Sequence, residues 1–152
     1  LLDEPFSALD MYLKDRLQQE LQELLEDYEG TVIMVSHSRD EVYRFSEELL
    51  IIDQGQIVAA GKTKELFQNP LHPYTQGLLS CIPHLGVKKG EPLPVIEGSV
   101  PPLSKVPVGC HFCTRCKMAD QHCMEHEPPA CEVAPGHVVK CWKYAESGKQ
   151  EV

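Results

Sequence analysis

The sequence predicts an α/β fold for the first part of the chain and an irregular, cysteine-rich C-terminal extension for the rest. Before residue 69, apolar residues recur at helical spacing or in short β-branched runs. Eleven of the 12 prolines lie at or after Pro70, and six of the 7 cysteines fall between Cys110 and Cys141. Residues 1–69 carry 15 acidic and 6 basic side chains, whereas residues 70–152 carry 8 of each. We therefore divide the chain into two regions, 1–69 and 70–152.

The overall composition argues against two classes of protein. The net charge of −9 argues against a nucleic-acid partner, which normally requires a basic face. The longest apolar run, Leu49–Ile52, is far shorter than the ~20 residues that a membrane helix needs. The chain opens on an apolar strand at Leu1, with neither Met nor a secretory signal pattern, so we expect it to be a piece of a longer protein.

The first 47 residues predict a helix, a strand and a second helix. One helical stripe of apolar residues precedes Gly30, which we expect to cap the helix; it consists of Leu13, Leu17, Leu21, Leu24 and Tyr28. Residues Thr31–Val35 form a short β-branched run typical of a buried parallel strand. Ser38 and Glu41 have the spacing of a capping box, which predicts a helix that continues to about Glu47.

The next segment predicts a hairpin and two short helices. Strands at Glu48–Asp53 and Gln56–Ala60 flank the turn Gln54–Gly55. Helices follow at Thr63–Gln68 and Pro73–Cys81, the second with proline at its first position and His72 at its entry. Residues 83–109 hold many prolines and little periodicity, so we expect an extended connection there.

The first candidate catalytic residues are Asp3 and Glu4, which stand at the end of an apolar strand. Ligands bind at the carboxyl edge of open α/β sheets, and adjacent carboxylates there can divide the work of phosphoryl transfer. One can hold Mg²⁺ while the other orients or deprotonates the attacking water. Residues 1–4 alone favour an ordinary strand end with a solvated Asp–Glu pair, because such pairs are common.

The residues that follow Asp3 and Glu4 extend this pair into motifs that resemble a known family. Residues 1–10, Leu-Leu-Asp-Glu-Pro-Phe-Ser-Ala-Leu-Asp, are similar to the joined Walker B motif and D-loop of ATP-binding cassette (ABC) ATPases, which are P-loop NTPases. The segment Val35–Glu41 resembles that family's switch, a strand that ends in a histidine. The separation of Asp10 and His37 also matches the family.

The resemblance implies a role for each matching residue. Asp3 would coordinate the Mg²⁺ that accompanies ATP, and Glu4 would be the catalytic base. His37 would contact the γ-phosphate of ATP. Ser7 and Asp10 would reach across the interface to a second ATPase subunit.

Three family motifs are missing from the sequence. It contains no Gly-x-x-x-x-Gly-Lys-Ser/Thr P-loop, no Q-loop and no Leu-Ser-Gly-Gly-Gln signature. All three precede the Walker B strand in the family, so we expect this chain to represent a C-terminal half that cannot hydrolyse ATP by itself.

The second region resembles a particular subfamily. The segment Gln68–Ser80, with its His-Pro-Tyr-Thr sequence, is similar to the start of the C-terminal extension of oligopeptide and dipeptide importer ATPases. Residues 94–102 and the Gly109–Cys110 pair are also similar to that extension. Phe6 and Ser36–Glu41 are closer to importers of oxyanions, polyamines and sugars, so an ATPase of such an importer is the alternative.

The cysteine cluster predicts a metal centre. Disulfides are the alternative in a secreted protein, but the ATPase motifs indicate the cytoplasm, where thiols stay reduced. Thiolates suit iron–sulfur clusters and Zn²⁺. The spacing of four of them resembles the peptide-importer tail, some members of which carry a [4Fe–4S] cluster; they are Cys110, Cys116, Cys123 and Cys141. A four-thiolate Zn²⁺ site is the alternative, and Cys113 and Cys131 are further candidates.

Together these features predict the ATP-binding subunit of an ABC importer, most simply one for oligopeptides or dipeptides. The resemblance implies ATP and Mg²⁺ as ligands and a second ATPase subunit and transmembrane permease subunits as partners. A periplasmic or lipoprotein substrate-binding protein would act indirectly, and the site of action would be the cytoplasmic face of the membrane. The alternative from another class is a free-standing iron–sulfur or zinc module.

Overall fold

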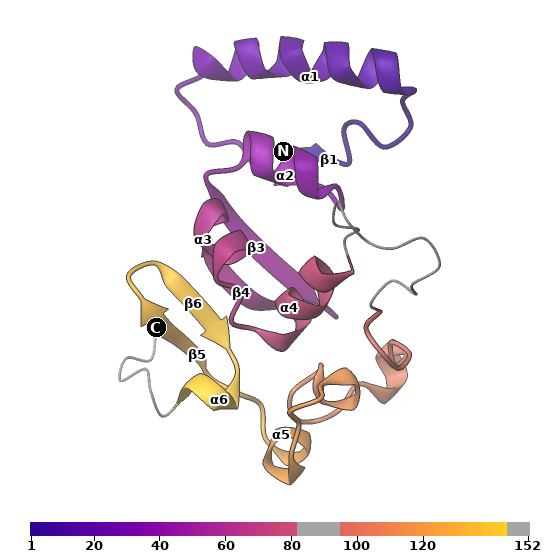
Figure 1. Ribbon diagram of the computed structural model, residues 1–152, viewed down its shortest axis with the longest axis vertical. Helices are drawn as coiled ribbons and strands as arrows, with labels where there is room; N and C mark the ends of the chain where they lie inside the picture. The colour runs from indigo at the N-terminus through magenta and orange to yellow at the C-terminus, as the bar shows by residue number, and fades with distance from the viewer. Residues whose placement is uncertain (82–94, 146–152) are drawn as a thin grey trace, which may run out of the picture. The chain divides into compact units, whose positions relative to one another are not determined.

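A computed structural model describes residues 1–81 and 95–145, and these form an α/β structure (Figure 1). The chain divides into two compact units, Leu1–Glu47 and Glu48–Val152. Most of the predicted extended connection, residues 82–94, lies outside the described residues. Each unit is described separately below.

The first unit contains two short parallel strands and two helices. Strand β1 (Leu2–Asp3) pairs with β2 (Met34–Val35), with Leu2 opposite Met34 and Asp3 opposite Val35. Helix α1 (Met11–Glu26) begins after Asp10, whose carboxylate accepts a hydrogen bond from the backbone N–H of Leu13. Helix α2 (Arg39–Phe45) follows β2 directly. The strands bring residues 4 and 36 of the sequence to the same edge.

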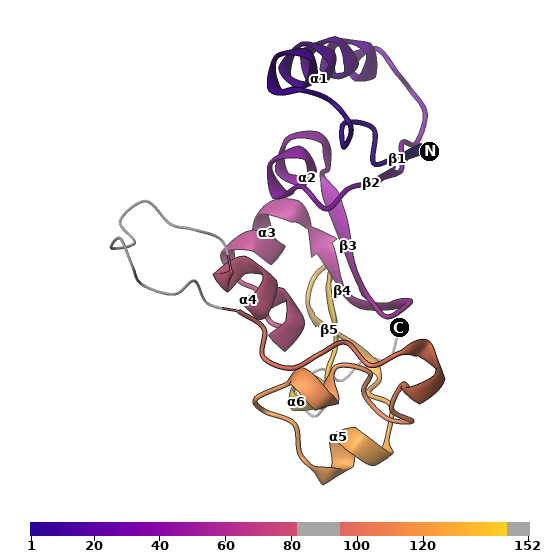
Figure 2. The ribbon, with the colours of Figure 1, turned by 90° about the vertical axis from the view of Figure 1, so that its right-hand side faces the viewer.

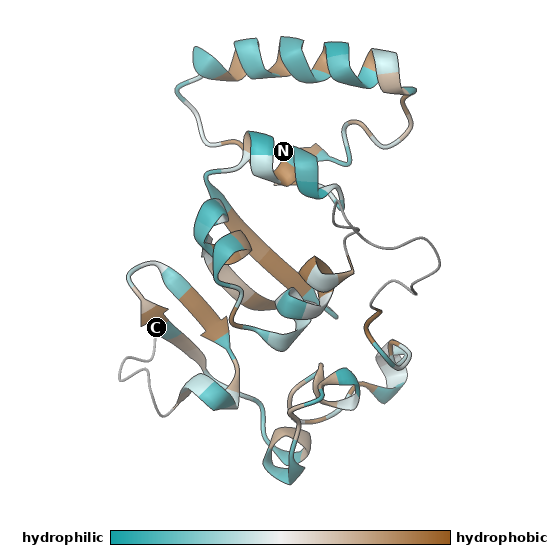
Figure 3. Cartoon of the chain, in the orientation of Figure 1, coloured by the Kyte–Doolittle hydropathy of each residue, from teal (hydrophilic) through white to brown (hydrophobic). Residues whose placement is uncertain are grey.

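The apolar stripe predicted for α1 is only partly covered. Leu24 and Tyr28 are exposed, while Gln18 is the residue of this helix that is buried. Figure 3 shows that much of α1 is hydrophilic. Polar side chains also join α1 to α2. Gln18 and Gln22 accept hydrogen bonds from Arg44, at 3.3 and 2.9 Å. The prediction of a helix was therefore right, but part of its apolar stripe is exposed.

Three local predictions in the first unit were wrong. The buried strand expected at Thr31–Val35 is shortened to Met34–Val35, and Val35 is 48% exposed. Helix α1 ends at Glu26 with Asp27 as its C-terminal cap, so Gly30 is not the cap. A Cβ on Gly30 would lie 2.5 Å from the ring of Tyr28, whose side chain is exposed. Ser38 occupies the N-cap of α2, which ends at Phe45, but its side chain makes no capping hydrogen bond. The carboxylate of Glu41 bonds Ser36 and Lys14.

The second unit contains a four-stranded antiparallel sheet of order β3-β4-β6-β5. The predicted hairpin is confirmed: β3 (Glu48–Asp53) and β4 (Gln56–Lys62) are joined through Gln54 and Gly55. These two residues have φ angles of 47° and 78°, as a tight hairpin turn requires. Strands β5 (Ala130–Ala134) and β6 (His137–Lys140) complete the sheet, with Ala59 opposite Val139.

Short helices surround this sheet. The predicted helices are confirmed as α3 (Thr63–Gln68) and α4 (Pro73–Ser80), which lie on the same face of β3 and β4 (Figures 1 and 2). His72 opens α4, because its Nδ1 accepts a hydrogen bond from the backbone N–H of Tyr74 at 3.1 Å. The remaining helices are η1 (Leu103–Lys105), η2 (Cys113–Arg115), α5 (Gln121–Glu125) and α6 (Trp142–Ala145).

A compact core holds the second unit together. Its buried apolar residues are Val58, Ala59, Leu66, Phe112, Cys113, Cys131 and Val139. Arg115 also lies inside, where it pairs with Asp53 at 2.7 Å and stands 4.9 Å from the centre of the Phe112 ring. Both side chains of this ion pair are almost fully buried.

The compact units meet at Glu47 and Glu48, whereas the sequence analysis divided the chain near Asn69. The difference arises because β4 pairs with β6, so residues 48–69 share one sheet with the C-terminal strands. Strands β5 and β6 lie in the region that was predicted to be irregular. None of the described helices is long and apolar enough to cross a membrane.

Candidate functional site

The ends of β1 and β2 bring Glu4 and His37 into contact. The Oε1 atom of Glu4 lies 2.8 Å from Nδ1 of the His37 ring and accepts a hydrogen bond from the His37 backbone N–H at 3.1 Å. The His37 side chain is otherwise open to solvent, with 79% of its surface exposed. A carboxylate and an imidazole thus meet at the strand edge where parallel sheets bind their ligands.

The backbone of Glu4 is held in an uncommon conformation. Its φ angle is 45°, in the left-handed region that non-glycine residues rarely adopt. Three hydrogen bonds hold it there: its N–H donates to the carbonyl of Val35, and its carbonyl accepts from the N–H and the hydroxyl of Ser7. Strained backbone of this kind is concentrated at functional sites.

The other predicted residues of this site lie near Glu4 in the chain. Asp3 is exposed at the end of β1, and its side chain makes no hydrogen bond or ion pair with any described residue. Ser7 bonds the carbonyl of Glu4 at 3.0 Å, and Asp10 caps α1. The structure therefore gives Ser7 and Asp10 local roles; their predicted reach toward a second subunit stays a prediction.

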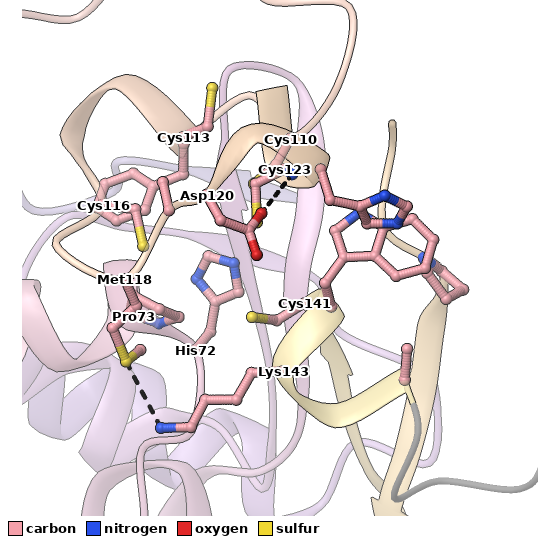
Figure 4. Close-up of a pocket in the computed structure, with 16 residues that line it drawn as sticks. His72, Pro73, Cys110, Cys113, Cys116, Met118, Asp120, Cys123, Cys141 and Lys143 are labelled. Carbon is pink, nitrogen blue, oxygen red and sulfur yellow. Dashed lines mark hydrogen bonds between the residues drawn. The ribbon is translucent and has the colours of Figure 1, made fainter. Parts of the chain in front are cut away.

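Four predicted cysteines line one pocket of about 820 Å³ in the second unit (Figure 4). Residues far apart in the sequence meet there, since His72 precedes α4 and Cys141 precedes α6. The sulfur atoms of Cys116 and Cys141 point toward the centre of the pocket, whereas the sulfur of Cys113 points away from it. The predicted cysteines in the lining are Cys110, Cys116, Cys123 and Cys141.

The thiols in the pocket disfavour the charged form. Burial raises the pKa of the Cys110 thiol to about 11; a backbone hydrogen bond at Phe112 opposes this shift, and neighbouring thiols add to it. Burial also raises the pKa values of Cys123 and Cys141, with further contributions from the thiol of Cys116. Thiols this close repel one another once ionised, and a bound cation would reverse that effect.

The pocket has the donors of a metal centre without the geometry of one. No group of three or more His, Cys, Asp or Glu side chains in residues 1–81 and 95–145 stands close enough to hold a metal ion. Cys131 is buried in β5 and is absent from the pocket lining. The donor set nevertheless fits a soft metal or an iron–sulfur cluster, because five cysteines line the pocket, the four predicted ligands and Cys113.

Sequence reasoning missed two polar residues in this lining. His72 is buried and reaches the pocket from the start of α4, and burial lowers its pKa to about 4. Asp120 accepts a hydrogen bond from the backbone N–H of Cys123 at 2.9 Å and so caps α5. An aspartate placed three residues before Cys123 was the sequence signal for this cap.

Comparison with known proteins places the chain beside ATP-binding proteins of peptide transport. Residues 58–123 match the family described as "Oligopeptide/dipeptide transporter, C-terminal region". The chain is 34% identical over 96% of its length to a peptide import ATP-binding protein of Brucella ovis. It is 32% identical over 99% of its length to the oligopeptide transport ATP-binding protein AppD of Bacillus subtilis, and 36% identical over 95% to AppF of the same organism. The chain spans 45% or 46% of the length of these relatives.

Proposed function

We infer the function from one premise: the chain belongs to the ATP-binding proteins of the oligopeptide/dipeptide type of ABC importer. We propose that it supplies the catalytic carboxylate and the switch histidine of an ATPase that drives peptide import. The relatives named for peptide transport favour peptides over oxyanions or sugars as the imported substrate.

The contact between Glu4 and His37 carries this proposal. A general base must be oriented so that it faces the water it deprotonates, and the two bonds from His37 fix the Glu4 carboxylate. If Glu4 is the base, the imidazole beside it would stabilise charge on a transferring phosphoryl group. Thirty-three positions separate these residues in the chain, so their meeting follows from the pairing of β1 with β2.

Asp3 fits the expected magnesium ligand. Mg²⁺ prefers oxygen donors and is commonly held by one or two carboxylates together with substrate phosphates. The Asp3 carboxylate is exposed at the strand end and is free of ion pairs within the described residues. The metal would neutralise charge on the phosphates of bound ATP, and the protein would contribute this one carboxylate from β1.

The complete ATPase would need elements that this sequence lacks. We propose that a P-loop and a signature motif are supplied by another part of a longer protein, since the chain spans less than half of its relatives and contains neither motif. A second ATPase subunit and transmembrane permease subunits would complete the importer. The ATPase would then act at the cytoplasmic face of the membrane, and the substrate-binding protein would act through the permease.

Two measurements test this function. Titration calorimetry of the chain with Mg·ATP should show no binding, because the backbone amides and lysine of a P-loop are missing. In the complete protein, His37→Ala should lower ATP turnover by about 10-fold or more. Ser38→Ala is the matched control in the same turn, because the Ser38 hydroxyl makes no capping hydrogen bond. Equal turnover in the two variants would contradict the proposed role of His37.

We also propose a structural metal centre in the second unit, held by Cys110, Cys116, Cys123 and Cys141. The observation that favours it is the shared pocket, which these four cysteines line although Cys110 and Cys141 are 31 positions apart and Cys123 lies in α5. A [4Fe–4S] cluster or Zn²⁺ would be bound by thiolates, and binding energy would appear as folding energy of this region. Zinc accepts four cysteine ligands in a tetrahedral arrangement, as an alternative to the cluster.

Metal analysis decides between these forms. Anaerobic purification should yield brown protein with iron and acid-labile sulfide for the cluster, and colourless protein with one zinc for the alternative. Cys123→Ser should lower metal content, while Cys81→Ser should not, since Cys81 lies outside the pocket. Full metal content after loss of all four proposed ligands would refute the assignment.

A further inference from the structure

Glu41 is a buried charge that the proposed reaction does not use. Only 3% of its side chain is exposed, although it lies in the first turn of α2, where glutamate usually faces solvent. Its Oε1 atom pairs with Nζ of Lys14 at 2.6 Å, and its Oε2 atom accepts a hydrogen bond from the hydroxyl of Ser36 at 2.5 Å. A buried carboxylate with two partners on different elements fixes those elements relative to each other.

The bond to Ser36 continues into the turn that carries His37. The oxygen of the Ser36 hydroxyl accepts a hydrogen bond from the backbone N–H of Ser38 at 3.0 Å. Because Glu41 accepts the hydroxyl proton of Ser36, the lone pairs of the serine oxygen are left to face Ser38. The Ser36–Ser38 hydrogen bond therefore spans His37 and holds the turn that carries it. The backbone N–H and the ring of His37 contact Glu4.

Lys14 supplies the charge that lets Glu41 stay ionised. Burial alone would raise the pKa of Glu41, but hydrogen bonds from Lys14 and Ser36, with the charges of Lys14 and His37, together lower it. Lys14 lies one turn into α1, and its backbone N–H bonds the carbonyl of Asp10. The ion pair therefore joins the start of α1 to the first turn of α2.

We propose that Glu41 is a positioning residue for His37, acting through Ser36, with Lys14 as its counter-ion. This inference rests on the proposed function, because it assigns Glu41 to the same Glu4–His37 site. The side-chain partners of Glu41 are Ser36 and Lys14, and Glu4 is not among them. The role of Glu41 is to hold the Ser36–Ser38 turn so that His37 meets the Glu4 carboxylate.

Two variants break the connection without removing His37. In Glu41→Gln the amide nitrogen cannot accept a hydrogen bond, so either Lys14 or Ser36 loses its partner. Ser36→Ala removes the link to Ser38 and leaves the Glu41–Lys14 pair in place. Asp40→Asn is the matched control, because it removes a carboxylate from the same helical turn. The Asp40 side chain is 90% exposed, and its pair with Arg39 is long, at 3.5 Å.

Amide exchange measured by NMR on this chain tests the positioning role independently of ATP. The informative signal is the His37 N–H, because it bonds Glu4 and neither substituted residue. We expect it to exchange about tenfold faster in Glu41→Gln and in Ser36→Ala, and at the wild-type rate in Asp40→Asn. An unchanged His37 rate in both test variants would overturn the inference.

Turnover by the complete protein then tests its catalytic consequence. Glu41→Gln and Ser36→Ala should lower kcat by about 10-fold with KM for ATP changed less than about twofold, since a small misplacement of a reacting group mainly affects the chemical step. Normal kcat in both variants, with His37→Ala impaired, would overturn the positioning role. Normal kcat in His37→Ala itself would refute the proposed function, while the exchange rates would still decide whether Glu41 holds the turn.

Discussion

The two compact units of this chain are stabilised in different ways. In the second unit, a set of apolar side chains is buried around the sheet, among them Val139, which has no exposed surface. In the first unit, Phe6 is the buried apolar residue among those described, while Met11, Tyr12 and Leu24 are 82%, 79% and 71% exposed. Polar contacts from Lys14, Gln18 and Gln22 join its helices instead.

Apolar burial is concentrated in the second unit, whereas the Glu4–His37 contact lies in the first. The second unit buries apolar side chains such as Leu66 and Val139, and burial of this kind is the main favourable term in folding. The first unit carries the Glu4–His37 contact on two strands of two residues each, supported by hydrogen bonds and one buried ion pair. Its geometry depends on polar contacts, so we expect substitutions there to change function more than stability.

The largest loss of stability should come from the buried ion pair of the second unit. Arg115→Leu leaves the Asp53 carboxylate buried without its partner and should destabilise this unit by about 3–5 kcal/mol. Fluorescence of Trp142, the single tryptophan of the sequence, reports urea unfolding of this unit. Lys117→Met is the control, because the Lys117–Glu97 pair is exposed on both sides. Equal unfolding midpoints would show that the buried pair does not stabilise the unit.

A matched pair of leucines contrasts the two units directly. Leu66→Ala removes a side chain that is 1% exposed and should cost about 2–5 kcal/mol. Leu24→Ala truncates a side chain that is 71% exposed and should change stability by less than about 0.5 kcal/mol. Circular dichroism during urea unfolding measures both. A large cost at Leu24 would mean that the first unit also depends on apolar burial.

Acid should destabilise the second unit through His72. Burial lowers the pKa of His72 to about 4, and the charge of Asp53 and a backbone bond at Lys140 only partly oppose this shift. Between pH 6.5 and pH 4 the unfolded chain binds a proton that the folded unit does not, so stability is complete above pH 6.5 and falls as pH decreases. The loss should approach about 3 kcal/mol near pH 4.

The variant His72→Asn isolates this effect. Asparagine keeps a side-chain acceptor for the N–H of Tyr74 but does not titrate. Trp142 fluorescence in urea at pH 7.5 and pH 4.5 should show a smaller pH dependence in the variant. The same pH dependence in both proteins would assign the acid sensitivity to other groups.

Local signals in the sequence predicted local structure well. The Gln54–Gly55 turn and the proline at the start of α4 act within a few residues, and both elements appear where they were expected. The hairpin of β5 and β6 was missed although Pro135–Gly136 is a turn signal, and Gly136 has a φ of 73°. The pairing of Ala59 with Val139 could not be predicted, because the register of distant strands depends on tertiary packing.

At the candidate site, too, local sequence signals predicted the elements but not the contacts between distant residues. The strand end at Asp3–Glu4 and the turn at His37 were visible in the sequence, and the structure brings Glu4 and His37 together. The spacing of Ser38 and Glu41 predicted a capping box, yet Glu41 bonds Ser36 and Lys14. A local pattern cannot report that Lys14, 27 positions away, competes for the carboxylate.

Turnover by the complete protein carrying Glu4→Gln tests the central claim most directly. Glutamine keeps the size of Glu4 and an oxygen for the His37 bonds but cannot take a proton from water. The account predicts that ATP turnover falls by about 10²–10⁴-fold while ATP binding is largely retained. Normal turnover in this variant, with ATP bound as in the unsubstituted protein, would contradict the assignment of Glu4 as the catalytic base.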